Sequence, residues 1–321
     1  MNITSFPAWA LSAVAASLLA SGAAQACSSC GCLLNSDWAS QGFKADAGLT
    51  LDLRHDYFDQ DQLRSGTGTM NRSSLTFPNE QEIQQRTTNH VTTLTADYGI
   101  NADWGVSLQL PYISRSHTTI AAGDTDLSSS RSSSFGDARV LGRYRGFNAE
   151  RSWGLLFGLK LPTGAIDVNF NGGPQADQPL DRGLQAGTGS TDLLVGAYHF
   201  GSIGAGLDYF GQVLVQAPLS TKDQFKPGVT TTLTAGLRYV SESGIVPQLQ
   251  LNLRHEGRES GDNADAPNSG STLVYLSPGA TVALTEQLQG YGFVQVPIYQ
   301  HVTGLQLEPK VTFSLGLRYG F

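Results

Sequence analysis

The sequence predicts an all-β protein: a transmembrane antiparallel up-and-down β-barrel of about twelve strands, with an N-terminal segment in the lumen or on the periplasmic side. Three observations support this prediction. Segments of about ten residues alternate apolar and polar side chains, as membrane-crossing strands do. Short and long connections alternate along the chain. Tyr and Trp recur at one end of the expected strands.

Composition agrees with this fold and excludes some functions. Of 321 residues, 40% are hydrophobic, 15% are charged and 37 are glycine. No apolar run after residue 26 is long enough for a membrane-spanning helix, so membrane embedding must use strands. The formal charge is −7 and the basic residues are scattered. A protein without a basic stripe is not expected to bind nucleic acid.

The N-terminus has the pattern of an export signal. An apolar stretch from Phe6 to Ala20 is followed by Ala24-Gln25-Ala26, a small-residue cleavage pattern, although no Lys or Arg precedes the stretch. We therefore expect three parts: a signal peptide over 1–26, a cysteine-containing N-terminal segment over 27–45 that can act as a plug, and the barrel over 46–321.

The strands are predicted from period-two alternation, which is clearest in Val311-Phe313-Leu315-Leu317-Tyr319-Phe321. The expected strands are 46–58, 88–98, 103–115, 136–146, 152–162, 190–200, 205–216, 229–240, 245–256, 272–284, 288–301 and 309–321.

Connection lengths and aromatic residues predict the orientation. Long polar connections are expected at 59–87, 116–135, 163–189, 217–228 and 257–271, and the links between them are short. Outer-membrane barrels have short periplasmic turns and long extracellular loops, with aromatic girdles at the membrane interfaces. We therefore expect an outer-membrane location with both termini periplasmic. The residues expected in the periplasmic girdle are Tyr98, Tyr144, Tyr198, Tyr239, Tyr319, Trp104 and Trp153.

The last expected strand ends on Phe321, with apolar residues at every second position back to Val311. A terminal aromatic on such a strand resembles the signal read by the outer-membrane assembly machinery. We expect that machinery, outer-membrane lipid and lipopolysaccharide as partners.

Alternation also predicts the lumen lining, because lipid cannot satisfy the polar side chains of these strands. Two interpretations remain open: an internal network of arginines with carboxylates that holds the barrel shape, or a selectivity lining that favours anionic solutes. Inward aromatic rings, including Tyr299, indicate either a path for an apolar or aromatic solute or filling of a small barrel. The lining residues expected to matter most are Arg54, Arg143, Lys160, Arg238, Arg254, Arg318, Phe210, Tyr275, Tyr291 and Phe293.

The stretch from Gly136 to Pro218 carries a family resemblance. Its segments GDARVLGRYR, GLKLPTG and GTGSTDLLVGAYHF resemble the outer-membrane barrel family named for the MetA pathway of phenol degradation. The resemblance covers the central quarter of the chain and implies transport of small, often hydrophobic or aromatic, molecules. It carries over no catalytic residue.

A cysteine cluster opens the expected mature chain. Cys27, Cys30 and Cys32 are the only cysteines. Their spacings suit Cu(I) or Zn(II), although tetrahedral zinc would lack a fourth ligand. In the oxidising periplasm a disulfide with one leftover thiol is the competing chemistry. A lipid on Cys27 is the third alternative.

The expected function is an outer-membrane channel or transporter for small, hydrophobic or aromatic solutes. The first alternative is a metal- or redox-responsive protein that uses the cysteine cluster. The second is a lipid hydrolase at His255 and Ser260, which the sequence disfavours because Gly257 occupies the position where a serine close to the histidine would be needed. We therefore expect no enzymatic activity.

Overall fold

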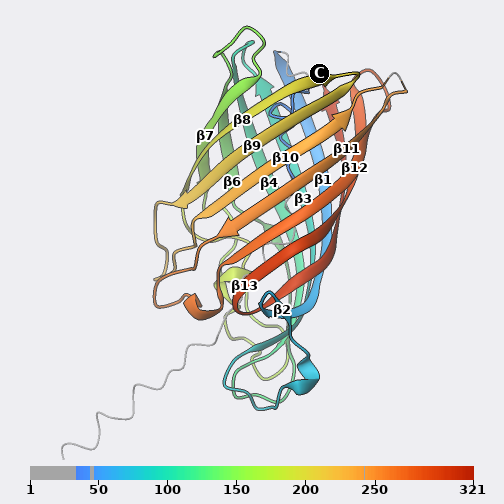
Figure 1. Ribbon diagram of the computed structural model, residues 1–321. Coiled ribbons are helices and arrows are strands. Elements are labelled where there is room, and N and C mark those ends of the chain that lie inside the picture. The colour runs from blue at the N-terminus through green and yellow to red at the C-terminus, as the bar shows by residue number, and fades with distance from the viewer. Residues whose placement is uncertain (1–33, 44–46, 242) are drawn as a thin grey trace, which may run out of the picture.

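A computed structural model describes residues 34–43, 47–241 and 243–321, and these form one closed antiparallel β-barrel (Figure 1). The expected signal peptide and all three cysteines lie outside the described residues. β1 pairs with both β3 and β13, which closes the ring. The elements of the ring are β1 (Gly48–Gly66), β3 (Ile83–Gly99), β4 (Trp104–Ile120), β6 (Ala138–Tyr144), β7 (Trp153–Leu161), β8 (Asp192–Gly204), β9 (Leu207–Pro218), β10 (Thr230–Tyr239), β11 (Ile245–Glu256), β12 (Ser271–Ala283) and β13 (Leu288–Gly320).

β13 makes two of the passes around the ring. Its residues 289–302 pair with β12 and its residues 302–320 pair with β1, both antiparallel. Gly304 lies between these parts with φ of +70°, a left-handed conformation that favours glycine. Eleven elements with β13 counted twice make twelve passes, an even number that lets neighbours stay antiparallel all the way round. The prediction of about twelve strands is confirmed.

The outer elements sit at the end of the barrel where the connections are long. They are β2 (Gly68–Thr69), which pairs with β1, and β5 (Ser128–Phe135), which pairs with β4, together with three short 3₁₀ turns, η1 (Arg72–Ser74), η2 (Arg182–Leu184) and η3 (Ala266–Asn268). The described residues contain no helix that is long and apolar enough to cross a membrane. We call this end the long-loop end and the opposite one the short-link end.

Strand ends at the long-loop end differ from the prediction. β1 continues to Gly66, β3 begins at Ile83 and β4 ends at Ile120, so the expected connections 59–87 and 116–135 are partly strand. Their polar side chains, mostly Thr, Ser and Gln, carry no apolar face that a period-two pattern could reveal. The hydrogen bonds between these strands continue beyond the part of the wall whose outer face is apolar.

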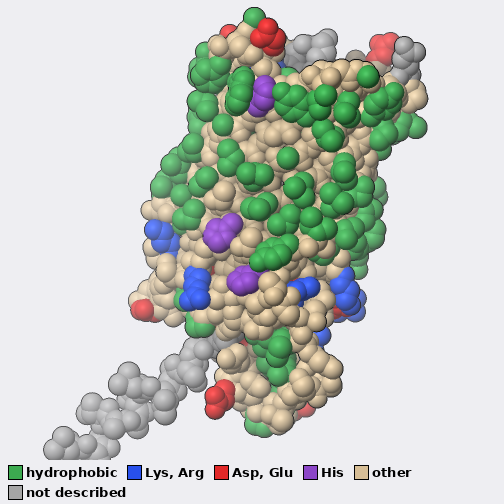
Figure 2. Space-filling model, viewed as in Figure 1, with side chains coloured by type: hydrophobic (Ala, Val, Ile, Leu, Met, Phe, Trp, Pro, Cys, Tyr) green, Lys and Arg blue, Asp and Glu red, His purple; other side chains and the backbone are tan. Residues whose placement is uncertain are grey.

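The two faces of the barrel wall differ in chemistry. Hydrophobic side chains cover the outside (Figure 2), and Leu53, Leu108, Phe157 and Leu315 are among those exposed there. Gln, Thr, Asn and Ser side chains fill much of the inside. A lipid-facing wall around a hydrogen-bonded interior is the arrangement that a bilayer requires of strands.

The predicted aromatic level is correct except for one residue. Tyr98, Trp104, Trp153, Tyr239 and Tyr319 are exposed near the short-link end. Tyr144 lies at the same level, half-buried against Trp104 with ring centroids 4.6 Å apart. Tyr198, in contrast, is buried at 2% exposure and points inward. Its neighbour His199 takes the outward position instead, stacked on Trp153 with ring centroids 4.1 Å apart.

The prediction for Tyr299 is wrong. The β12–β13 register shifts at Val274/Tyr275: Val274 is opposite Tyr299 but Tyr275 is opposite Pro297. The extra residue in β13 is a β-bulge, which reverses the alternation locally. Tyr299 is therefore exposed at 46%.

Candidate functional site in the barrel lumen

Residues 34–43 lie inside the barrel, and we call them the lumen segment. Leu34, Trp38 and Gln41 are almost completely buried. The segment forms a tight turn in which the Phe43 amide donates to the Trp38 carbonyl at 3.0 Å. Gly42 has φ of +80°, and a Cβ there would lie 2.6 Å from the ring of Phe200. Only glycine suits this turn and its close approach to the wall.

Trp38 anchors the lumen segment to β1 and β13. Its ring packs edge-on against Tyr291, with centroids 4.7 Å apart, and against Phe43 at 5.1 Å. Its Nε1 donates to Oδ2 of Asp52 at 3.0 Å, while the Tyr291 hydroxyl donates to Oδ1 of the same carboxylate at 2.9 Å. A buried indole with its N–H satisfied combines apolar burial with a directional bond.

Polar side chains hold the segment on the opposite wall. Asn35 Nδ2 and Ser40 Oγ both donate to Oε1 of Gln212, at 3.0 and 2.6 Å. Arg238 donates to the Gly42 carbonyl at 3.2 Å, and its guanidinium lies 4.4 Å from the centre of the Phe43 ring. These bonds come from β9 and β10, so the segment spans the lumen from one side to the other.

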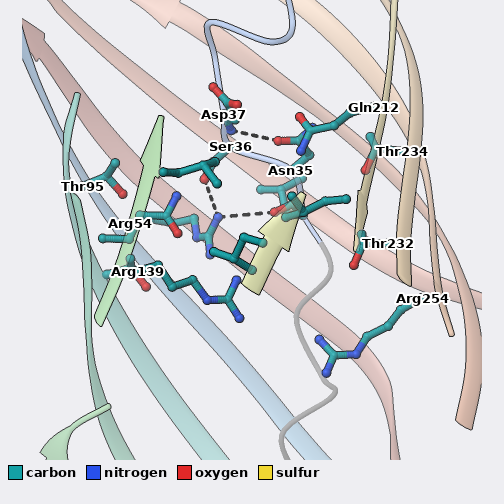
Figure 3. A pocket seen from close by; sticks show the side chains of 16 residues that line it. Asn35, Ser36, Asp37, Arg54, Thr95, Arg139, Gln212, Thr232, Thr234 and Arg254 are labelled. Atoms are coloured by element: carbon teal, nitrogen blue, oxygen red, sulfur yellow. Dashed lines mark hydrogen bonds between the residues drawn. The ribbon is translucent and has the colours of Figure 1, made fainter. Parts of the chain in front are cut away.

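A cavity of about 170 Å³ lies beside the lumen segment (Figure 3). Arginines from three separate strands line it: Arg54 of β1, Arg139 of β6 and Arg254 of β11. Thr and Gln side chains of the wall and Asn35, Ser36 and Asp37 of the lumen segment make up the rest of its polar lining. Its apolar lining consists of Leu34, Leu141, Leu194 and Leu214.

The three cavity arginines differ in their partners. Arg54 pairs with Asp56 at 2.8 Å, and Arg254 pairs with Glu256 at 3.0 Å, each two residues along the same strand. Arg54 also donates to Ser36 of the lumen segment. Arg139 donates to the amide oxygen of Gln216 at 3.1 Å. Within the described part of the chain, no carboxylate lies within 4.0 Å of Arg139.

Other predicted interior cations form ion pairs. Arg143 binds the two carboxylate oxygens of Asp97 at 3.0 and 3.1 Å, and Arg238 pairs with Asp208 at 3.0 Å. Lys160 lies between Asp137, at 2.9 Å, and Asp192, at 3.1 Å. These pairs have the geometry of an internal network that holds neighbouring strands together. Arg318 lines the lumen next to the lumen segment.

The predicted inward aromatic rings face the interior but lie flat against the wall. Phe210, Tyr275, Tyr291 and Phe293 are all buried. A Cβ on the neighbouring strand's glycine would lie about 2 Å from the ring at Gly236 beside Phe210, at Gly279 beside Phe293 and at Gly316 beside Tyr291. Phe210, Tyr291 and Phe293 therefore occupy the space left by missing side chains and thicken the wall rather than outline an apolar path.

The long-loop end is covered by the connection 162–191, which folds inward. Phe170, Leu180 and Leu184 form a buried cluster there, and Arg115 of β4 donates to the Leu184 carbonyl. We call the buried carboxylates around this loop, Glu82, Asp181 and Glu259, the mouth carboxylates.

Two of the mouth carboxylates, Asp181 and Glu259, are protonated more readily than ordinary acids. Burial, reinforced by Glu82, raises the pKa of Asp181 well above its usual value. Burial and the nearby Glu256 and Asp265 raise the pKa of Glu259 to about 8. His117 lies 3.8 Å from Glu82 and is fully buried.

The lumen segment's partners were not found from the sequence. Trp38 meets Asp52, and Asn35 meets Gln212, only because distant strands converge, and the one sequence signal was an isolated Trp in a polar stretch. The hydrolase residues do not form a site in the described chain. His255 is bonded to Thr272 on the outer wall, and Ser260 pairs through its backbone with Lys226.

One solved structure supports the fold, and a second aligns less well. The chain is similar to the COG4313 outer membrane channel from Pseudomonas putida F1, with a TM-score of 0.58 and 14% identity over 87% of this chain and 97% of that one. The Ralstonia pickettii toluene transporter TbuX aligns with a TM-score of 0.46 and 10% identity over 86% and 90% of the two chains.

No family model and no curated protein matches the sequence. The resemblance to the MetA-pathway barrels is therefore not confirmed, whereas the architecture it implied is. At 14% identity the likeness concerns the fold alone. The chain has the closed barrel fold of the Pseudomonas outer membrane channel.

Proposed function

We propose that this protein is an outer-membrane channel for small solutes, with both termini periplasmic and with the lumen segment restricting passage. The observation that carries the proposal is the lumen segment itself, bonded across a polar interior by Trp38, Asn35 and Ser40. A wall that is apolar outside and polar inside suits a barrel whose interior meets water. The short links at one end, the long loops at the other and the aromatic residues near the short-link end support the outer-membrane location and the orientation.

The bonds of the lumen segment favour a movable restriction over a permanent core. Apart from the Trp38 cluster, its contacts with the wall are hydrogen bonds, one cation–π contact and one ion pair of Asp37 with Arg143 at 3.8 Å, which water can replace. A net hydrogen bond contributes only about 0.5–1.5 kcal/mol. The Trp38 side chain is therefore the largest single anchor of the segment.

Trp38→Ala tests this function. Removing the indole and its bond to Asp52 should free the segment and raise single-channel conductance several-fold in planar bilayers containing the full-length barrel. Trp153→Ala, on the outer wall, is the matched control and should leave conductance unchanged. If neither the native protein nor Trp38→Ala conducts, the channel function is wrong.

The solute class and the binding partners belong to the same proposal. We propose small hydrophobic or aromatic solutes, with outer-membrane lipid and lipopolysaccharide around the wall and the assembly machinery at Phe321, whose side chain is 71% exposed. Liposome swelling with neutral solutes of increasing size would measure the passage directly. Equal swelling for small and large solutes would contradict a restricted lumen.

The cysteine cluster is a second candidate for control of the channel. Cys32 precedes the buried Leu34 by two residues in the sequence, so chemistry on Cys27, Cys30 and Cys32 would act on the lumen segment. Binding of Cu(I) or Zn(II), or formation of a disulfide, would then change conductance. Conductance that stays the same with added metal, reductant and a triple Cys→Ser variant would rule this role out.

A further inference from the structure

We propose that the cavity among Arg54, Arg139 and Arg254 is a subsite for the carboxylate group of a small solute with an apolar body. The proposal rests on the channel function above and names its preferred solute class.

The charge of the cavity lining favours an anion. Among the described residues that line the space, three are arginines and Asp37 is the single carboxylate. The carboxylate of Asp37 lies 3.8 Å from Arg143, outside the arginine group. The acids that pair with Arg54 and Arg254 do not line the cavity. Three like charges around one small space repel one another, and a bound anion relieves that repulsion.

Arg139 is the member best placed to bind a ligand. Its contact with Gln216 uses Nη2, and guanidinium has five N–H donors. Gln216 in turn donates to Asp192 at 2.6 Å, and Asp192 also pairs with Lys160. The Gln216 amide therefore separates Arg139 from the negative charge of Asp192. Arginine binds a carboxylate with two parallel hydrogen bonds when both of its donor edges are accessible.

The volume of the cavity and its apolar lining indicate the size and polarity of the rest of the solute. A cavity of about 150 Å³ lined by apolar side chains can hold benzene. The space here is about 170 Å³, and Leu141, Leu194 and Leu214 form its apolar side. A hydrated inorganic anion would gain nothing from those leucines. A ring-sized organic carboxylate matches both sides of the cavity.

The lumen segment links the subsite to passage. Leu34 and Ser36 form part of the cavity wall, and both contact the guanidinium of Arg54. A carboxylate that binds Arg54 competes with these contacts. Occupation of the subsite should therefore weaken the hold of the wall on the segment.

Benzoate, benzyl alcohol and benzylamine are probes of nearly equal size that differ in charge. Calorimetry on the full-length barrel in detergent should detect benzoate binding, with benzyl alcohol and benzylamine at least about tenfold weaker. Arg139→Gln keeps a polar side chain but removes the charge and should weaken benzoate binding about tenfold. Arg86→Gln, on the outside, is the matched control and should bind like the native protein.

Liposome swelling then separates this inference from the channel function. Preferential uptake of benzoate that Arg139→Gln abolishes supports both. Equal uptake of all three probes, with no benzoate binding, overturns the subsite and leaves the channel intact. Benzoate binding without any uptake retains the subsite and contradicts the channel. If Arg139→Gln fails to fold, Arg139→Lys, which keeps the charge, is measured instead. The native barrel alone still tests the subsite, because it must bind benzoate more tightly than benzyl alcohol and benzylamine.

Discussion

The lumen carries its charges in two different ways. Along the strands, most of the basic side chains in the lumen lie beside an acid on the same or a neighbouring strand, as Arg143 lies beside Asp97. At the long-loop end, Glu82, Asp181 and Glu259 gather in connections, with the pKa values of Asp181 and Glu259 raised. The register of the strands sets which acid lies beside each of these basic side chains. The carboxylates on the loops are brought together when the loops fold, so the protonation of Asp181 and Glu259 depends on whether the loops are closed.

The largest expected effect comes from breaking a pair on the strands. Lys160 of β7 sits between Asp137 and Asp192 and is buried with them. Lys160→Met would leave two buried carboxylates without their cation, which typically costs about 3–5 kcal/mol. We expect the free energy of unfolding, measured with denaturant in lipid vesicles, to fall by that amount. Lys222→Met, at an exposed site, should change it little, and a similar small loss for Lys160→Met would contradict fixed pairing.

The intermediate effect is a pH dependence of the mouth. The folded loop keeps a proton on Glu259 up to a pKa of about 8, whereas an open loop loses it near the ordinary value of 4.5. The closed loop is therefore fully stabilised below the lower value and loses that stabilisation as pH rises through about 8.

Hydrogen exchange of residues 257–270, corrected for intrinsic rates, should consequently show weaker protection at pH 9 than at pH 6. Glu259→Gln should remove most of the difference, while Glu286→Gln in a short link should not. Protection that rises with pH would show that the mouth carboxylates do not act as described.

The smallest effect is expected on the outside. Arg86 pairs with Asp59 at 2.7 Å, but its side chain is 60% exposed, and such pairs contribute at most about 1 kcal/mol. Arg86→Gln should shift the unfolding midpoint barely at all, and less still in high salt. A loss of stability comparable to that of Lys160→Met would mean that solvent exposure does not explain the difference between the Arg86 pair and the buried Lys160 pairs.

The sequence predicted the wall better than the contents of the lumen. Alternation locates apolar faces, so β11 was predicted with the bounds that it has. It misses polar strand extensions such as the end of β1, and it fails at the bulge beside Tyr299. These errors share a cause, because a period-two pattern records only which face meets lipid.

The site could be predicted only in part. Inward positions of Arg54 and Arg254 follow from alternation, but 200 residues separate them, and their meeting depends on barrel closure. The lumen segment carries no repeating pattern. Its place is set by partners such as Gln212, which is 177 residues from Asn35. Information of that kind lies in the assembled barrel.

The seam between β1 and β13 has a consequence for assembly. It joins residues as distant as Asp56 and Ser314, 258 positions apart, and it completes the ring. Contacts between residues so far apart form slowly, because most of the chain must be ordered first. A segment connected directly to β1 is more easily enclosed while the seam is open than threaded through a finished ring. The strands would then assemble around residues 34–43 before the seam closes. Removal of these residues should slow assembly as well as widen the passage.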